Sequence, residues 1–494
     1  MAKGQQHTRA YSNSNKTQFA LPSLFSSSYP LDHGGYQNGI LDRPDTLTEQ
    51  LKAAGYETAL FSNMIRVRKV YGYARGADHL FNFVDAFVTL AQFYTQDVQA
   101  SDNRYRLRPR KIEDIKSDLL ESVPELLDGL SKELHERINY PDYMHSNIMP
   151  HSKEYLQYQF DVIEGLRNSF QSAPDRFVNG LCKASDPYTA LWPRHPDLIP
   201  LPMNASSHHL AACLCNWLKH RSRLDRPFFA YVQFLEAHDR LTTTMDRELS
   251  ARERAEEVDH NDDLRREIMQ QKGAYNGSTN YDQSLRLVDG KIRIILDKIE
   301  EMGLTGETLF VVTADHGFMN GVAQRRHVDL TDMLEETIHV PLAFVHPDIE
   351  PRVEEGLCCH LDVAPSILGF LGLASPPGFQ GNDLVSSPSP SRKFILSENN
   401  GRGVCDLVGK NIYLALRGER WKIQYCDKPV GPGPVSRGMI MAIHDLTVDP
   451  GELIKWDRSK KIPEEVNDLI PIAVNRCRKL RMENSPLGAD SGTA

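Results

Sequence analysis

The sequence has few cysteines, and their spacing excludes the usual structural roles of cysteine. Eight cysteines are scattered over 494 residues, and none occurs before Cys182. Neither Cys213-x-Cys215 nor the adjacent Cys358 and Cys359 has the spacing of a zinc site, and the adjacent pair is too close for an ordinary disulfide. We therefore expect reduced thiols, mostly in the core, and a cytoplasmic protein.

Long apolar runs and an excess of basic charge are also missing. No apolar stretch approaches membrane-spanning length and no signal peptide precedes the first folded segment, so we expect no membrane segment in this chain. The net charge of −9 argues against a nucleic-acid partner, because a nucleic-acid binder would carry a basic face. The hydrophobic content of 40% and the length predict a soluble protein with one large and one smaller domain.

The most informative segment that is present runs from Leu309 to Gly317. An apolar run, Leu309–Thr313, is typical of a buried strand in a parallel sheet, and it leads directly into Asp315, His316 and Gly317. Open α/β sheets place their ligand sites at such strand ends. The adjacent carboxylate and imidazole could bind one divalent metal, and the glycine allows a sharp turn. The alternative is a buried strand that ends in a polar turn without a site.

Other segments predict the organisation of the chain around this motif. Residues 281–299 have helical spacing, whereas residues 227–234 and 340–345 are apolar strands. Residues from about 90 to 200 are helix-rich and charged, and we interpret them as an insertion. Pro- and Ser-rich text at 375–391 predicts a linker, followed by short strands. We therefore expect a large domain over 1–385 and a C-terminal subdomain with a tail over 386–494.

The order of these motifs resembles the alkaline phosphatase superfamily, and within it the sulfatase-like branch. The resemblance covers most of the chain apart from the helical block, and rests on Pro22–Ser26 with Tyr29-Pro30 and His33-Gly34, Asp45–Thr58, Asp315–Gly317, Glu335–Leu342, Leu416–Ile423 and His444–Glu452. It implies an α/β sandwich with a mostly parallel central sheet flanked by helices, plus a small C-terminal antiparallel subdomain.

The nucleophile region departs from the sulfatases that use formylglycine. Those enzymes need Cys or Ser two residues before the Pro-Ser pair and Arg just after it, whereas this chain has Ala20 and Leu24. The spacing of Thr17 instead resembles the Thr nucleophile of lipoteichoic acid synthases and phosphoethanolamine transferases. A Thr hydroxyl needs activation, which a divalent metal would provide. The alternative for Thr17 is a helix cap, and the other candidate nucleophiles are Ser12, Ser14 and Ser23.

Further roles follow from the same resemblance. His238, after the 227–234 strand, is expected to contact the ester or assist the leaving group, and its alternative is a hydrogen bond to a loop carbonyl. His327, behind Arg325 and Arg326, is expected to bind phosphate or another metal. Guanidinium groups match phosphate and sulfate geometry, so Arg326 is a candidate for substrate binding. The alternative for this stretch is a solvated basic loop.

One element of the family is missing from the sequence. The family places a first strand, ending in an acidic metal ligand, before the nucleophile, but the sixteen residues before Thr17 contain no Asp or Glu. We expect this strand and its ligand to be absent here, either because they lie upstream or because the chain is a degenerate relative. A metal held only by Thr17, Asp315 and His316 would be under-coordinated.

The resemblance implies a metal-dependent enzyme that hydrolyses or transfers sulfate or phosphate esters through Thr17. The metal would be Mn, Zn, Ca or Mg, bound by Asp315, His316 and Thr17, with His238 and His327 stabilising charge on the transferred group. The substrate would be a small-molecule ester or one linked to a glycan or lipid. The alternative is a catalytically inactive sulfatase-fold protein that binds an anionic glycan or a partner protein.

Overall fold

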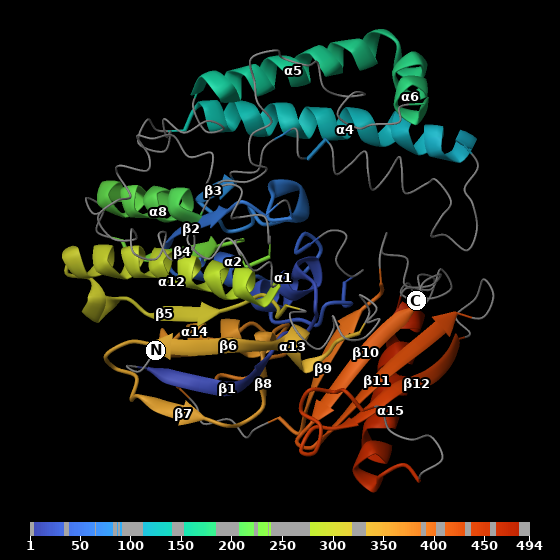
Figure 1. Cartoon of the computed structure of the whole chain (residues 1–494). Helices are drawn as coiled ribbons and strands as arrows, with labels where there is room; N and C mark the ends of the chain where they lie inside the picture. The colour runs from blue at the N-terminus through green and yellow to red at the C-terminus, as the bar shows by residue number, and fades with distance from the viewer. Residues whose placement is uncertain are drawn as a thin grey trace, which may run out of the picture.

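In the computed structural model, the chain forms two sheets flanked by helices, a separate helical layer and a C-terminal antiparallel sheet (Figure 1). It describes residues 4–33, 39–64, 66–82, 86, 89–90, 112–140, 153–183, 207–221, 226–235, 237–238, 277–318, 332–386, 392–401, 411–429, 436–454 and 461–483. None of the described helices combines the length and apolar character needed to cross a bilayer.

The first sheet has three parallel strands in the order β3-β2-β4 (β2 Glu57–Ser62, β3 His79–Asn82, β4 Phe228–Gln233). Helices α8 (Ser207–Arg221) and α12 (Gly277–Glu301) pack on one face through an apolar cluster that includes Trp217 and Ile299. Helix α2 (Leu47–Ala53) contributes to the cluster on the other face. Thr46 caps α2 by accepting a hydrogen bond from the Glu49 N–H, and Gly55 follows with a φ of 91°.

The second sheet is mixed rather than parallel. Its order is β5-β6-β1-β7, with β8 also paired to β1 (β1 Gln5–Tyr11, β5 Phe310–Thr313, β6 His339–Val345, β7 Arg352–Glu354, β8 Cys358–Cys359). Strands β5 and β1 run antiparallel to β6, whereas β7 and β8 run parallel to β1. Helices α1 (Thr17–Ser26) and α14 (Val363–Phe370) share an apolar cluster with this sheet.

Strand β1 corrects the expectation that no strand precedes Thr17. The sequence does not show an alternation of apolar and polar residues here, because two of the buried positions, Gln5 and His7, are polar, as is the exposed Thr8. Their burial is possible because the Gln5 side chain donates to the Leu384 carbonyl at 2.8 Å and to the His7 Nε2 at 3.0 Å. The strand contains no carboxylate, so the expected absence of an acidic ligand in these sixteen residues stands.

Strands β4 and β5 were expected to be buried, and both are only half-buried. They contribute side chains to the same two apolar clusters, Phe228 and Phe310 to one and Phe229 and Val311 to the other. Among the described residues, however, each strand pairs on one edge alone, β4 with β2 and β5 with β6. The two sheets therefore contribute to the same apolar clusters. The edges of β4 and β5 that face each other have no hydrogen-bonded strand partner among the described residues.

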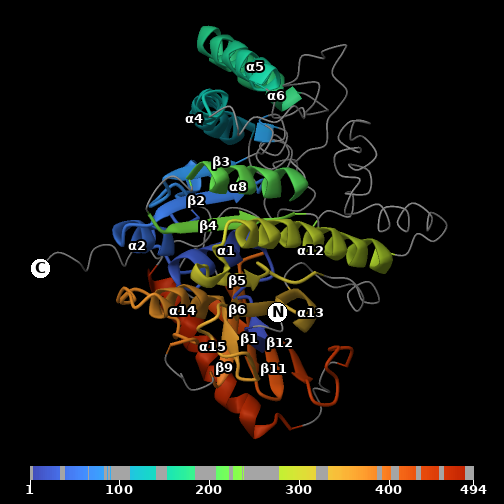
Figure 2. The same cartoon turned by 90° about the vertical axis from the view of Figure 1, so that its left-hand side faces the viewer.

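The helical block forms a layer of its own, set apart from the sheets in Figures 1 and 2. Its described helices are α4 (Ile112–Ile138), α5 (Lys153–Ser172) and α6 (Pro174–Lys183). They enclose a separate apolar cluster that includes Leu119, Leu127 and Ile163. The interpretation of this block as an insertion and the division at residue 385 both stay predictions.

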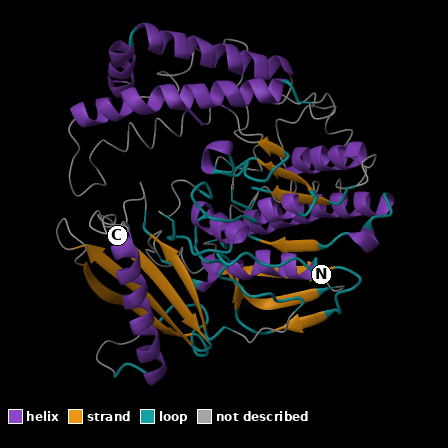
Figure 3. Ribbon diagram, turned by 180° about the vertical axis from the view of Figure 1, so that it is seen from behind, coloured by secondary structure: helices purple, strands orange, loops and turns teal. Residues whose placement is uncertain are grey.

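The C-terminal part is an antiparallel sheet in the order β12-β11-β10-β9 (β9 Phe394–Asn399, β10 Ile412–Gly418, β11 Trp421–Pro429, β12 Ser436–Asp445). Helix α15 (Glu464–Glu483) covers one face, as Figure 3 shows. Its apolar residues pack against Leu414, Leu416 and Ile423, together with Phe19 of α1. The predicted α/β fold with a small antiparallel subdomain is thus confirmed. The seven described cysteines are free thiols, as expected.

The helical layer should be destabilised on its own by a cavity in its cluster. Ile163 is fully buried, and we expect Ile163→Ala to lower the free energy of unfolding of this layer by about 2–4 kcal/mol. Hydrogen exchange followed by mass spectrometry should show faster exchange in α4 and α5 and unchanged exchange in β2. Equal acceleration in β2 would show that the layer and the sheets unfold as one unit.

Candidate active site

The predicted metal pair lies directly beyond β5. Asp315 and His316 follow Thr313 after one residue, and Gly317 then donates its N–H to the Thr337 carbonyl at 2.9 Å. Helix α13 (Glu335–Ile338) contains Thr337 and packs tightly against this turn. A Cβ at position 317 would lie 2.2 Å from the Glu336 carbonyl oxygen. Glycine is therefore required here by the close approach of two backbone segments.

Thr17 meets this pair from the start of α1. It is the first residue of the helix and is 4% exposed, and its Oγ1 lies 3.2 Å from His316 Nε2. The N-cap position belongs to Lys16, whose side chain makes no capping hydrogen bond. The alternative interpretation of Thr17 as a helix cap is therefore wrong, and its hydroxyl instead points to the strand end.

The tautomer of His316 follows from its second nitrogen. Nδ1 lies 2.7 Å from the Gly317 carbonyl oxygen, which can only accept, so Nδ1 carries the proton. In the neutral ring, Nε2 then presents a lone pair toward Thr17. It can accept the Thr17 hydroxyl proton in a hydrogen bond or bind a metal. Metal-binding histidines commonly donate their other ring N–H to a backbone carbonyl in this way.

Asp315 stays ionised at the same place. Burial opposes its charge, but nearby His316, a hydrogen bond from Thr17 and the His316 backbone N–H together hold its pKa below the ordinary value. That N–H donates to Oδ1 at 3.0 Å, and Oδ2 lies 3.7 Å from His316 Nε2. The three predicted residues Thr17, Asp315 and His316 thus converge in the structure.

Two further side chains fix the backbone of the strand end. Ser12 Oγ donates to the Asp315 carbonyl at 2.7 Å and lies 2.5 Å from the Ser14 carbonyl. His360 donates from Nε2 to the Ala314 carbonyl at 2.9 Å. Burial lowers the pKa of His360 to about 4, so this ring is neutral at pH 7. Sequence reasoning left His360 out of the site, and a histidine two residues before Asp362 gives no signal of this backbone contact.

The alternative nucleophiles are held in structural contacts or enclosed. Ser12 uses its hydroxyl as described above, and Ser23 donates to the Ser28 carbonyl at 3.0 Å. Ser14 is fully buried, and its hydroxyl has no hydrogen-bond partner among the described residues. Of the hydroxyls named from the sequence, only that of Thr17 contacts the side chains of Asp315 and His316 in the described part of the chain, whereas Ser12 contacts the Asp315 backbone.

The remaining predicted residues are not brought to this cluster. His238 is exposed beyond β4, and among described residues no contact joins its side chain to Thr17, Asp315 or His316. Its backbone N–H donates to the Leu235 carbonyl at 2.9 Å, a local turn. Arg325, Arg326 and His327 lie outside the described residues.

The donor atoms fit part of a metal site. Two ligands that each lie about 2.1 Å from one cation can be up to roughly 4 Å apart, so separations of 3.2 and 3.7 Å are compatible with a shared ion. One carboxylate, one imidazole and one hydroxyl form an incomplete set, and no group of three or more His, Cys, Asp and Glu side chains occurs within the described ranges. The residues thus fit a cation that takes further ligands from elsewhere.

Comparisons with known proteins identify the family of this chain. A family profile described as Sulfatase matches residues 1–373. Arylsulfatase K of Bos taurus is 28% identical over 194 residues, which are 37% of this chain and 33% of the relative. N-acetylglucosamine-6-sulfatase of Bos taurus is 24% identical over 202 residues, 35% of each chain. The chain therefore spans about a third of the length of the curated relatives it matches.

Solved structures agree on the fold. The phosphonate monoester hydrolase of Agrobacterium radiobacter has a TM-score of 0.50 at 14% identity, covering 98% of this chain and 89% of its own. An alkaline phosphatase superfamily protein from Vibrio parahaemolyticus has a TM-score of 0.50 at 11% identity, covering 98% of this chain and 80% of its own. The family match covers more than two thirds of the sequence. The chain thus has the alkaline phosphatase superfamily fold and belongs to the sulfatase family.

Proposed function

We propose that this chain is an esterase that cleaves sulfate or phosphate esters, with Thr17 as the nucleophile. The observation that carries the proposal is the 3.2 Å contact between Thr17 Oγ1 and Nε2 of His316, beside ionised Asp315. A hydroxyl next to two proton acceptors has the arrangement expected of an activated nucleophile.

The proposed reaction proceeds by displacement at sulfur or phosphorus. Thr17 Oγ1 attacks the central atom, its proton passes to the Asp315–His316 pair, and the bond to the alcohol oxygen breaks. The alcohol leaves with a proton, for which we propose His238 as the donor. Water then releases the sulfate or phosphate from Thr17 in a hydrolase, whereas a second alcohol would accept it in a transferase.

The start of α1 supports binding of the anionic ester. Its first N–H groups have no side-chain cap, and the first turn contains no acidic residue. Backbone N–H groups and the helix dipole favour a negative charge at such an end. An ester attacked by Thr17 would lie at this terminus, and we propose that Arg326 and His327 add further contacts to its oxygens.

A divalent metal fits this proposal at Asp315, His316 and Thr17. When bound, it would supply positive charge that offsets the charge developing on Thr17 and on the ester. Asp315 already lies ionised and His316 already has the tautomer that leaves Nε2 available. Mn, Zn, Ca and Mg remain the candidate ions.

The position of Ala20 supports Thr17 over a formylglycine. Ala20 lies three residues after Thr17 on the same face of α1 and is fully buried, and its methyl group offers neither a thiol nor a hydroxyl to modify. Thr17 lies one turn closer to the end of the helix. This makes it the residue of α1 that reaches the strand end beyond β5.

The relatives suggest which substrates to test first. Their names include an N-acetylglucosamine-6-sulfatase and an ulvan-active sulfatase, and the structural neighbours include a phosphonate monoester hydrolase. We propose sulfated glycans as the first class, followed by phosphate and phosphonate monoesters. A lipid-linked ester is the third class.

A second candidate is an inactive member that binds an anionic glycan or a partner protein. The observation that favours it is the incomplete ligand set, because the described residues hold no cluster of three or more metal-binding side chains. Elemental analysis of the purified chain separates the two functions. Near-stoichiometric metal supports the enzyme, and absence of metal together with glycan binding supports the inactive member.

Removal of the Thr17 hydroxyl should abolish turnover while the fold is retained. We expect Thr17→Ala to lower kcat by at least about 10³-fold, since the nucleophile is lost, with a thermal midpoint close to that of the parent. Thr17→Ser is the control and should keep measurable activity. Full activity in Thr17→Ala, measured on a sulfated glycan or an aryl ester, would refute the nucleophile assignment.

Neutralising Asp315 should weaken metal binding. We expect Asp315→Asn to reduce bound metal per chain by about 10-fold or more, because the charged ligand is lost. Asp348→Asn, at an exposed aspartate away from the cluster, is the matched control and should retain metal. Unchanged metal content in Asp315→Asn would mean that the ion binds elsewhere.

A further inference from the structure

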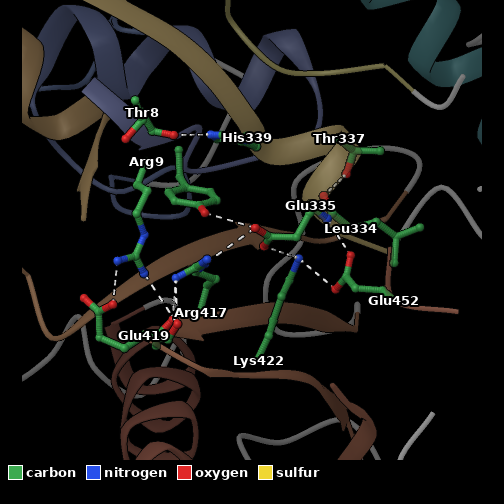
Figure 4. Close-up of polar contacts among 12 residues, drawn as sticks. Thr8, Arg9, Leu334, Glu335, Thr337, His339, Arg417, Glu419, Lys422 and Glu452 are labelled. Carbon is green, nitrogen blue, oxygen red and sulfur yellow. Dashed lines mark hydrogen bonds and ion pairs between the residues drawn. The ribbon is translucent and has the colours of Figure 1, made fainter. Parts of the chain in front are cut away.

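A buried charged cluster joins the C-terminal sheet to the turn that holds the site (Figure 4). We call it the α13 clamp, and it consists of Tyr11, Glu335, Arg417, Lys422 and Glu452. Lys422 Nζ donates to Glu335 Oε1 at 3.1 Å and forms an ion pair with Glu452 Oε1 at 3.0 Å. Arg417 lies 3.5 Å from Glu335 Oε2, which also accepts the Tyr11 hydroxyl at 3.0 Å.

The clamp also holds the backbone of α13. Glu452 Oε2 accepts the Glu335 N–H at 2.5 Å, so one carboxylate binds both the first residue of the helix and Lys422. Glu452 itself has a φ of 51°, an unusual backbone conformation for a residue with a Cβ, and its N–H donates to the Asp449 carbonyl at 3.0 Å. This turn brings the Glu452 carboxylate to the first residue of α13.

Helix α13 in turn holds the two segments that carry the site. Its Thr337 carbonyl accepts the Gly317 N–H at 2.9 Å, and its Ile338 carbonyl accepts the Ser12 N–H at 2.7 Å. Ser12 then donates its hydroxyl to the Asp315 carbonyl at 2.7 Å. A continuous series of hydrogen bonds therefore runs from Lys422 and Glu452 through α13 to Asp315 and His316.

The position of α13 depends on its contacts with residues of other elements, including Lys422 and Glu452. It has four residues, too few to be stable as an isolated helix. The Lys422 side chain is fully buried and that of Glu452 is 1% exposed. Buried charges are costly unless they are paired, so a displacement of α13 that separates Glu335 from Lys422 would be opposed by the cost of unpaired buried charge.

We propose that Lys422 and Glu452 are positioning residues for Asp315 and His316, so that the C-terminal sheet helps to hold the candidate site in place. This inference rests on the proposed function for its effect on metal binding, but its structural half does not. If the clamp is loosened, α13 shifts, the Gly317 turn loses its fixed hydrogen bond, and the donor atoms of the pair are no longer held at one geometry.

The test compares Lys422→Met with Arg481→Met. Arg481 of α15 is 2% exposed and forms an ion pair at 2.9 Å with Asp427, which lies on the same strand β11 as Lys422. Both variants remove one buried cation from the same subdomain. We expect Lys422→Met to raise the dissociation constant for Mn²⁺ about 10-fold and to speed hydrogen exchange over 314–318, and Arg481→Met to change neither.

A companion variant guards against failure to fold. Lys422→Met removes the cation that pairs with both Glu335 and Glu452. The double variant Lys422→Met with Glu452→Gln removes one positive and one negative charge, so it should be more stable than Lys422→Met alone. The double variant should show the same faster exchange over 314–318, and Lys422→Arg should restore slow exchange in part. Equal effects of Lys422→Met and Arg481→Met, or unchanged exchange over 314–318 in both clamp variants, would overturn the proposal.

The two proposals fail in different ways. If the parent chain binds no Mn²⁺ but the clamp variants still speed exchange over 314–318, the metal site fails and the structural role of the clamp stands. If the parent binds Mn²⁺ and the clamp variants bind it equally well, the proposed function stands and the positioning role is refuted.

Discussion

The hydrogen bond from the Gly317 N–H to the Thr337 carbonyl is the contact on which the candidate site depends. It fixes the backbone immediately after His316, and the space at position 317 accepts no side chain. The same turn supplies the Gly317 carbonyl that sets the His316 tautomer. Two short segments, whose contact joins residues 20 positions apart in the sequence (317 and 337), thus determine how the carboxylate and imidazole face Thr17.

This dependence changes the view of the C-terminal sheet. By sequence it is a separate small subdomain after a Pro- and Ser-rich stretch, and it has its own apolar cluster with α15. In the structure, β10 and β11 present Arg417 and Lys422 to α13, and Phe19 of α1 packs into the cluster of that sheet. The helix that begins with Thr17 and the turn after His316 are therefore both held by residues from beyond position 392.

Much of the fold and the centre of the site could be predicted from the sequence because the signals are local. The run into Asp315 and His316, the helix before it and the spacing of Thr17 each depend on neighbouring residues. Strand β1 could not be predicted, since its polar residues are buried only through partners such as Leu384, nearly four hundred residues away. The clamp gave no signal either, because Lys422 looks like a solvated strand residue until Glu335 and Glu452 meet it. Strand β1 and the clamp both depend on contacts between residues far apart in the sequence.

The edges of β4 and β5 that face each other have no strand partner among the described residues, and this has a consequence for handling the protein in solution. These strands consist mainly of Phe, Val, Ala and Thr, and along one edge of each the described residues leave the backbone groups without a strand partner. Such an edge is a template for pairing with another chain, and natural proteins usually protect it with charge, proline or a covering segment. The half-buried apolar side chains on these strands add a hydrophobic gain to any such pairing. Because these two edges face each other across shared apolar clusters, separation of the two sheets would expose both of them, and self-association that grows with concentration would follow that separation.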